Sequence, residues 1–219
     1  MRIGRVGSGT LTPELLDRVD DWARENDVSC LYFLADSGDA ASAHAAEEGG
    51  FRLMDVRVEL RREARPEDVP GVRTAREEDR DALRAIARVS HGITRFYADP
   101  GFPDERCDDL YDIWISRSLE GWAQGVLVAE RDGRPVGYVS CHLDDSQGSI
   151  GLIAVDESAR GAGLGVSLAR AAVGWCAEHG AEAISVVTQG RNTQALRTFE
   201  RGGFRVHSLE LWFHKWYEG

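Results

Sequence analysis

A glycine-rich turn between an apolar strand and a helix constrains this chain more than any other stretch. The run GLIAV (151–155) is rich in β-formers, the turn RGAGLG (160–165) follows, and helical spacing begins near Gly163. Successive backbone N–H groups at a helix N-terminus form a site for an anion. The same residues also suit an ordinary tight turn. The third glycine of a dinucleotide fingerprint falls on Val166 and no Gly-Lys-Ser/Thr follows, which argues against nicotinamide and nucleoside-triphosphate enzymes.

Strands and helices alternate along the chain, and this predicts a mixed α/β sheet. Hydrophobic spacing and caps predict helices at 13–25 and 163–179, a strand and helix within 72–90, helical spacing over 108–123, and strands at 28–36, 53–61 and 150–155. Asp132-Gly133 predicts the turn of a hairpin over 126–143. Residues 91–107 show no period, and no internal repeat is apparent.

A charged connector divides the chain. Residues 60–71 (LRREARPEDVPG) hold two prolines and mixed charges, which are typical of a boundary between units. We therefore expect a small α/β unit at 1–65 and a larger unit at 66–219.

Composition excludes several classes of protein. The net charge of -11 repels phosphate backbones, so nucleic acid is a poor partner. The four cysteines are far apart, without a C-x-x-C pair, which predicts neither disulfides nor a metal site. No apolar run approaches the ~18 residues of a membrane span, and the start lacks a signal peptide. A cytoplasmic protein without membrane contact is expected.

Two linked motifs place this chain beside a known family. The turn Arg160-x-x-Gly163-x-Gly165 is followed one βα unit later by NTQALRTFERGGF (192–204). Together they resemble the GNAT (GCN5-related) N-acetyltransferases, and the resemblance covers roughly residues 72–216. It implies the GNAT fold: a mixed, mostly antiparallel sheet with splayed central strands, here preceded by a small N-terminal half-domain. Within the family, the chain is most similar to the TDP-fucosamine (TDP-4-amino-4,6-dideoxygalactose) acetyltransferase type.

The resemblance implies acetyl-CoA as the acyl donor and no metal. The strand before the turn would pair its backbone with the pantetheine arm, the turn would hold the pyrophosphate, and Asn192 would meet the arm. The implied cofactor residues are Ile153, Ala154, Val155, Arg160, Gly161, Ala162, Gly163, Leu164, Gly165 and Asn192. Asn192 would serve equally well as the N-cap of the helix that follows it.

The resemblance also implies an acceptor side. The residues that would bind the acceptor are Arg95, Phe96, Tyr97, Thr188 and Gln189, with Thr94 beside them. Asp55, four residues after Phe51, would take the amine proton through water. The alternatives are an aromatic loop that packs onto its own domain and, for Asp55, a surface carboxylate on an alternating strand.

Phe199 departs from the family pattern. A tyrosine usually occupies this position and donates a proton to the departing thiolate, a role that Phe199 cannot fill. A general acid contributes ~10²–10⁴ in rate. A thiol pKa of ~8.5 and an α-amino-like pKa of ~7.7–8.0 soften that loss. We therefore expect direct attack of a small-molecule amine on the thioester in a ternary complex.

Three functions stay open at this stage. The first is N-acetylation of a nucleotide-linked amino sugar, and the second is acetylation of another small amine such as an aminoglycoside, a polyamine or a peptide N-terminus. The third is a module that binds acyl-CoA without turnover. The length of the acyl chain is open, and so is homodimerisation through the C-terminal strands or the first half-domain.

Overall fold

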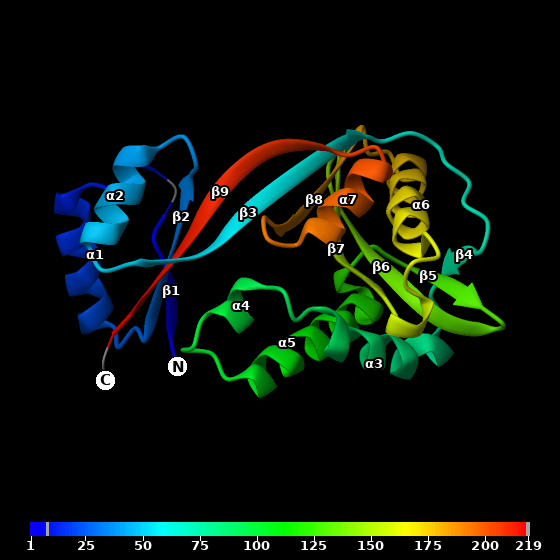
Figure 1. Ribbon diagram of the computed structural model, residues 1–219, viewed down its shortest axis with the longest axis horizontal. Helices are drawn as coiled ribbons and strands as arrows, with labels where there is room; N and C mark the ends of the chain where they lie inside the picture. Colours follow the sequence, from blue (N-terminus) through cyan, green and yellow to red (C-terminus); the bar gives the residue numbers. More distant parts are fainter. Residues whose placement is uncertain (8, 218–219) are drawn as a thin grey trace.

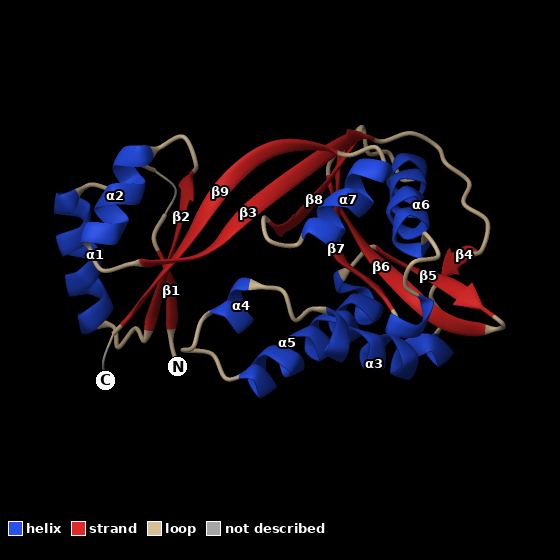
Figure 2. Ribbon diagram, viewed as in Figure 1, coloured by secondary structure: helices blue, strands red, loops and turns tan. Residues whose placement is uncertain are grey.

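One mixed sheet runs through the whole molecule. The computed structural model describes residues 1–7 and 9–217. The sheet has the order β1-β2-β9-β3-β8-β7-β6-β5-β4 (Figures 1 and 2). Its strands are β1 (Ile3–Arg5), β2 (Cys30–Asp36), β3 (Arg52–Glu63), β4 (Val72–Thr74), β5 (Gly125–Arg131), β6 (Arg134–Asp144), β7 (Gln147–Val155), β8 (Ala183–Gln189) and β9 (Arg205–Trp216). Only β1 with β2 and β7 with β8 pair in parallel among these strands, so the prediction of a mostly antiparallel sheet is confirmed.

Local signals account for most helices. The helices are α1 (Pro13–Glu25), α2 (Ala40–Glu48), α3 (Arg80–Ser90), α4 (Arg95–Ala98), α5 (Asp104–Arg117), α6 (Leu164–Glu178) and α7 (Thr193–Arg201). Thr12 caps α1 by accepting from the Leu15 N–H, and Pro13 follows at the first helical position. The aperiodic stretch 91–107 proves to contain α4, whose single turn is too short to show a period.

Two groups of helices bury opposite faces of the sheet. On one face α6 and α7 enclose a core that includes Leu168, Phe199 and Phe204. On the other face α3 and α5 pack under β5, β6 and β7 through Leu83, Ile115 and Tyr138. Figure 1 shows α6 and α7 above the central strands and α3, α4 and α5 below them. The central strands therefore lie between two layers.

The central strands splay as expected. The parallel pairing of β7 with β8 begins at Gln147 and Ala183 and ends at Ile150 and Val186. Beyond that point β7 continues to Val155 without a partner on this edge. The splay leaves unpaired main chain in the middle of the molecule.

The connector begins later than the sequence suggests. β3 runs to Glu63 and Leu60 is fully buried, so the boundary expected to start at residue 60 starts at Ala64. β3 lies between β9 and β8, and β9 in turn pairs with β2. The segments on either side of residue 65 therefore share one sheet and exchange strands.

The order of elements repeats, although the sequence shows no clear repeat. The order β1-α1-β2-α2-β3 has the same βαβαβ arrangement as β7-α6-β8-α7-β9, with a parallel first pair in each. Gly-Gly-Phe-Arg closes the second helix in both units, at 49–52 and 202–205. The repeat lies in the order and pairing of the elements, which composition and spacing do not reveal.

All four cysteines are buried and free. Among the described residues, no helix is both long enough and apolar enough to cross a membrane. Cys141 and Cys176 contact each other in the core beneath α6. The thiols of this pair therefore serve as small core side chains.

Candidate functional site

A cavity of about 830 Å³ opens where β7 and β8 separate. It brings together most of the residues predicted from the sequence: Asp55, Arg95, Phe96, Ile153, Ala154, Val155, Arg160, Gly161, Gly163, Leu164, Gly165, Thr188, Gln189, Asn192 and Phe199. Ala162 and Tyr97 are the two predicted residues that do not line it. The cavity thus joins the glycine-rich turn to the residues expected on the acceptor side.

The glycine-rich turn presents free donors to one end of the cavity. Gly161 and Gly163 have φ of 84° and 81°, a left-handed conformation that favours glycine. The helix α6 begins at Leu164 without a side-chain cap. The N–H groups of residues 161–165 donate to no group in the described chain. This arrangement suits an anion at the positive end of the α6 dipole.

Gly165 has a packing reason of its own. A Cβ at this position would lie 3.1 Å from Cγ2 of Thr198 on α7. The missing side chain therefore lets α7 approach the first turn of α6. Both Gly165 and Thr198 line the cavity.

The unpaired edge of β7 faces the cavity. The Asp156 N–H donates to the Val136 carbonyl and the Leu152 N–H to Ser140 Oγ, both on the β6 side. Because edges alternate along a strand, the peptide groups of Ile153 and Val155 point to the splay. Arg160 Nε lies 3.3 Å from the Val155 carbonyl, at the same edge. An extended ligand could pair with this edge as an added strand would.

Asn192 caps α7. Its Oδ1 accepts the Ala195 N–H at 3.1 Å, and the residue also lines the cavity. The N-cap alternative is thereby confirmed. The cap leaves the Asn192 amide nitrogen to contact a ligand, so that role stays a prediction.

Asp55 is buried at the other end of the cavity. It is 7% exposed, so the alternative of a surface carboxylate is wrong. Burial raises its pKa, and the positive charge of Arg191, 3.9 Å away, opposes that rise only in part. The Val56 N–H is its hydrogen-bond donor at 2.9 Å. A buried carboxylate with so few partners can bind a cation or accept a proton.

Arg95 is a second charged group with unused bonding capacity. Its guanidinium lies over the rings of Phe96 and Trp212, each at 4.2 Å, and of Tyr32 at 5.0 Å. Burial lowers its pKa. Its Nε has no hydrogen-bond partner among the described residues, and no described carboxylate forms an ion pair with it. A cation held in this way is suited to receive an anionic ligand.

Tyr97 points elsewhere. Its hydroxyl donates to Asp108 at 2.5 Å on α5, outside the cavity lining, so the expected position beside the acceptor is wrong. Phe199 is 2% exposed and packs edge-on against Phe204, with 5.8 Å between ring centroids. It contributes an apolar wall and no proton.

The cavity lining also includes residues outside the predicted site, among them the aromatic side chains of His91, Tyr111, Trp114 and Trp212. Trp212 lies on β9 and faces the cavity because β9 pairs with β3 at Asp55. Tyr111 and Trp114 lie on α5, where the spacing indicated a helix and nothing about its outward contacts. His91 follows the end of α3, at the start of the stretch without a period. No local signal in the sequence distinguishes them from core aromatics.

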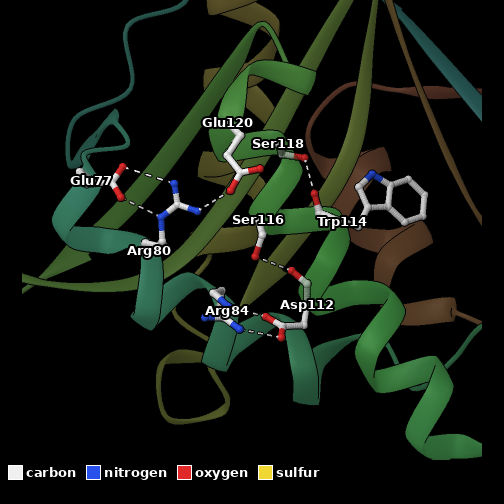
Figure 3. Close-up of polar contacts among 8 residues, drawn as sticks. All are labelled: Glu77, Arg80, Arg84, Asp112, Trp114, Ser116, Ser118 and Glu120. Carbon is white, nitrogen blue, oxygen red and sulfur yellow. Dashed lines mark hydrogen bonds and ion pairs between the residues drawn. The ribbon is translucent and has the colours of Figure 1, made fainter.

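Ion pairs hold α3 against α5 behind the cavity wall (Figure 3). Arg84 Nε donates to Asp112 at 2.6 Å. Arg88 forms a second ion pair with Asp112, and the two arginines lower the pKa of Asp112 to about 2. Ser118 Oγ donates to the Trp114 carbonyl at 2.9 Å, where α5 continues into the π-helical turn η2 (Ser118–Trp122). Figure 3 shows the Trp114 indole pointing away from the ion pairs. This clamp, the ion pairs of Arg84 and Arg88 with Asp112, thus fixes the wall that carries Tyr111 and Trp114.

Among the described residues, donor atoms of metal-ligand type meet at one buried place, away from the cavity. Cys30, Asp99 and His214 bring one such atom each within 4.8 Å of one another. His214 Nδ1 lies 2.5 Å from Asp99 Oδ2, a hydrogen-bond distance. Two ligands on a tetrahedral ion with bonds of about 2.0–2.1 Å lie about 3.3 Å apart. The cluster therefore has the geometry of a hydrogen bond that ties the α4 loop to β9.

Comparison with known sequences shows the family of the chain. The sequence model of the acetyltransferase (GNAT) family matches residues 86–204. The chain is 28% identical to a dTDP-fucosamine acetyltransferase of Escherichia coli O6:H1 over 94% of its length and 86% of that relative. It is 34% identical to a mycothiol acetyltransferase of Acidimicrobium ferrooxidans over 74% of its length. It spans about half of that second relative, 54%.

Solved structures share the fold. A conserved protein of unknown function from Staphylococcus epidermidis superimposes with a TM-score of 0.70 at 17% identity, over 98% of this chain and 84% of that one. A GCN5-related N-acetyltransferase from Sphaerobacter thermophilus superimposes with a TM-score of 0.67 at 18% identity, over 93% and 67%. At such identities the likeness concerns the fold alone.

Proposed function

The chain belongs to the acetyltransferase (GNAT) family, and from this premise we propose that it acetylates the amine of a nucleotide-linked amino sugar. The family makes it an N-acetyltransferase, and the identity of the acceptor is the proposed part. The dTDP-fucosamine acetyltransferase similar to nearly the whole chain supports this acceptor class. The two ends of the cavity supply the physical argument.

The turn end suits the donor, acetyl-CoA. The free N–H groups of residues 161–165 and the α6 dipole would hold its pyrophosphate. The open edge at Ile153 and Val155 would pair with its pantetheine arm, which carries amide groups of its own. The thioester would then lie near the splay, beside Phe199.

The presence of both Asp55 and Arg95 in the lining of one cavity is the observation that carries the acceptor proposal. Asp55 is a buried carboxylate suited to an amine, and Arg95 is a half-buried guanidinium, with its Nε buried, suited to an anion. An acceptor with an amine at one place and a negative charge at another satisfies both groups. A diphosphate-linked amino sugar has both, and Phe96 and Trp212 offer rings beside which a base can stack.

The reaction is a direct acyl transfer. The amine nitrogen attacks the thioester carbon, and N–H groups on the open edge of β7 stabilise the oxyanion that forms. Asp55 accepts the proton that the amine loses, directly or through water. The C–S bond then breaks, the electron pair goes to sulfur, and the amide and coenzyme A leave.

A panel of amines tests the proposal. Acetyl-CoA is supplied with nucleoside-diphosphate 4-amino and 2-amino sugars, the matching free amino sugars, an aminoglycoside and a polyamine. We expect kcat/KM for a nucleotide-linked sugar to exceed that of its free form about 10- to 100-fold, because a charged hydrogen bond contributes about 1.5–3 kcal/mol. The Arg95→Met variant should lose this preference and keep its affinity for acetyl-CoA. Equal rates on free and linked sugars would contradict the proposal.

A second candidate is acetylation of a different small amine. The similarity to mycothiol acetyltransferases supports it, although the chain spans only part of those proteins. The same panel separates the two, since this candidate requires the best substrate to lack a nucleotide. Calorimetric binding of acetyl-CoA without turnover of any amine would instead support a binding module.

A further inference from the structure

Tyr111 is the one phenol that lines the cavity among the described residues. The chain has five tyrosines. The other four hydroxyls lie elsewhere: Tyr97 bonds to Asp108, Tyr138 to His91, Tyr217 to Asp20, and Tyr32 is sealed in the core. Tyr111 lies beside Thr94, whose Oγ1 has no hydrogen-bond partner among the described residues. Tyr111 is thus the buried phenol-bearing residue that borders the cavity.

The Tyr111 ring is held in a fixed place. It stacks on His91 with 4.5 Å between centroids and on Trp114 with 6.0 Å. The clamp of Arg84 on Asp112 fixes α5 one residue further along the chain. A hydroxyl on such a ring needs little reorganisation before it reacts.

Tyr111 also packs against the part of β7 that no longer pairs with β8. It shares a buried cluster with Leu152 and Ala154, which lie in β7 beyond the last pair with β8. Phe199 reaches the same cavity from α7 on the opposite face of the sheet. The phenol and the phenylalanine therefore approach the splay from two sides, and only the phenol has a proton to give.

We propose that the Tyr111 hydroxyl donates the proton taken by the departing thiolate of coenzyme A, so that no phenol is needed at position 199. The assignment rests on the proposed function. When the C–S bond breaks, the electron pair goes to sulfur and the Tyr111 proton moves to it. The proton that the amine released to Asp55 then passes through water to the phenolate. The amine loses one proton and the thiol gains one, so the step balances.

The surroundings suit a group that must hold a proton and briefly lose it. Burial raises the pKa of Tyr111, which keeps the phenol protonated at neutral pH. The charge of Arg95 acts in the opposite direction and lowers that pKa, as the contact with Thr94 does. Arg95 would therefore stabilise the phenolate in the moment after transfer. Side-chain hydroxyls of serine and threonine are much weaker acids than a phenol.

The test exchanges the phenol between the two positions. With an acceptor from the panel, Tyr111→Phe should lower kcat about 10²- to 10³-fold and leave the acetyl-CoA Kd within about twofold. Adding Phe199→Tyr to that variant should restore at least about tenfold, whereas Phe199→Tyr alone should change the wild-type rate less than about threefold. A merely structural role for Tyr111 predicts no such rescue. Thermal melts check that every variant folds.

Tyr97→Phe is the matched control, because its ring belongs to the same stack and its hydroxyl lies outside the cavity. It should keep the wild-type kcat. A Tyr111→Phe enzyme within about threefold of wild type, or one that Phe199→Tyr fails to rescue, overturns the assignment alone. A wild-type enzyme without turnover on any amine overturns the proposed function and the assignment with it.

Discussion

The two βαβαβ units of this chain share an arrangement and differ in what they can bind. In the second unit, α6 begins without a side-chain cap and its first N–H groups are free. In the first unit, Thr12 caps α1, and Pro13 has no N–H to offer. The same strand-turn-helix therefore leaves the first helical N–H groups free in one unit and has a side-chain cap in the other. What decides is whether the chain itself uses the donors.

The parallel strand pair of each unit also differs in how much of its edge is paired. All three residues of β1 pair with β2, so the first unit has no open edge there. β7 pairs with β8 only from Gln147 to Ile150 and then runs on alone to Val155. The first unit instead contributes β3, which enters the second unit beside β8 and carries Asp55. The first unit thus supplies Asp55 to the lining of the cavity in the second unit.

The largest expected effect comes from removing the first unit. A fragment of residues 66–219 would expose one edge of β8 and both edges of β9, because β2 and β3 occupy those edges. Unpaired edges favour aggregation. We expect an insoluble or unfolded fragment, measured by circular dichroism and size-exclusion chromatography. A monomeric fragment with a cooperative melt would instead support an independent domain after residue 65.

Removing the first unit's contribution to the cavity should be the next largest effect. Asp55→Asn should lower kcat/KM about 10²- to 10⁴-fold if the carboxylate takes the amine proton. Steady-state rates measure this, with Asp17→Asn as a control on the exposed face of α1. A loss below about threefold would remove Asp55 from the reaction.

The same residue gives a pH dependence with a definite sign. Its pKa is raised in the folded chain, so the native state binds more protons than the unfolded one between the ordinary value of 3.8 and the raised value. Wild-type stability therefore falls as pH rises through that window, while activity rises with ionisation. Asp55→Asn should lack this fall and melt higher than wild type at pH 7. Chemical denaturation across the pH range checks both signs.

The glycine-rich turn should show a binding effect confined to the second unit. Gly163→Val places a β-branched residue at a φ of 81° and would misalign the N–H groups. Loss of one charge-assisted hydrogen bond, about 1.5–3 kcal/mol, raises the acetyl-CoA Kd about 10- to 100-fold. Gly7→Ala, in the corresponding turn of the first unit with no atom within 4 Å of the new Cβ, should leave the Kd unchanged. Calorimetry that finds the same change in the acetyl-CoA Kd for both variants would contradict the proposed difference between the two turns.

The two caps should give the smallest effects. Thr12→Ala and Asn192→Ala each remove an N-cap and should cost about 1 kcal/mol of unfolding free energy. Only Asn192→Ala should also weaken acetyl-CoA binding, because only that cap lines the cavity. Denaturant melts and calorimetry on the same samples separate the two consequences. A binding loss for Thr12→Ala would show that the helices of the two units are coupled.

Features that depend on neighbours along the chain follow from the local residues. The hairpin at Asp132-Gly133 has both residues at positive φ, 51° and 75°, and such turns are set by residue type. The turn at Gly161 and Gly163 and the cap at Asn192 were likewise foreseen from position and chemistry. These signals are local, so a single sequence can carry them.

Which side chains meet in the cavity depends on long-range packing. Asp55, Arg95 and Tyr111 come from β3, α4 and α5, and the exchange of β3 with β9 brings the first of them to the splay. The Tyr97 hydroxyl donates to Asp108, whereas Tyr111 lines the cavity. Burial and long-range strand pairing fix these outcomes, and neither is encoded in the spacing of nearby residues.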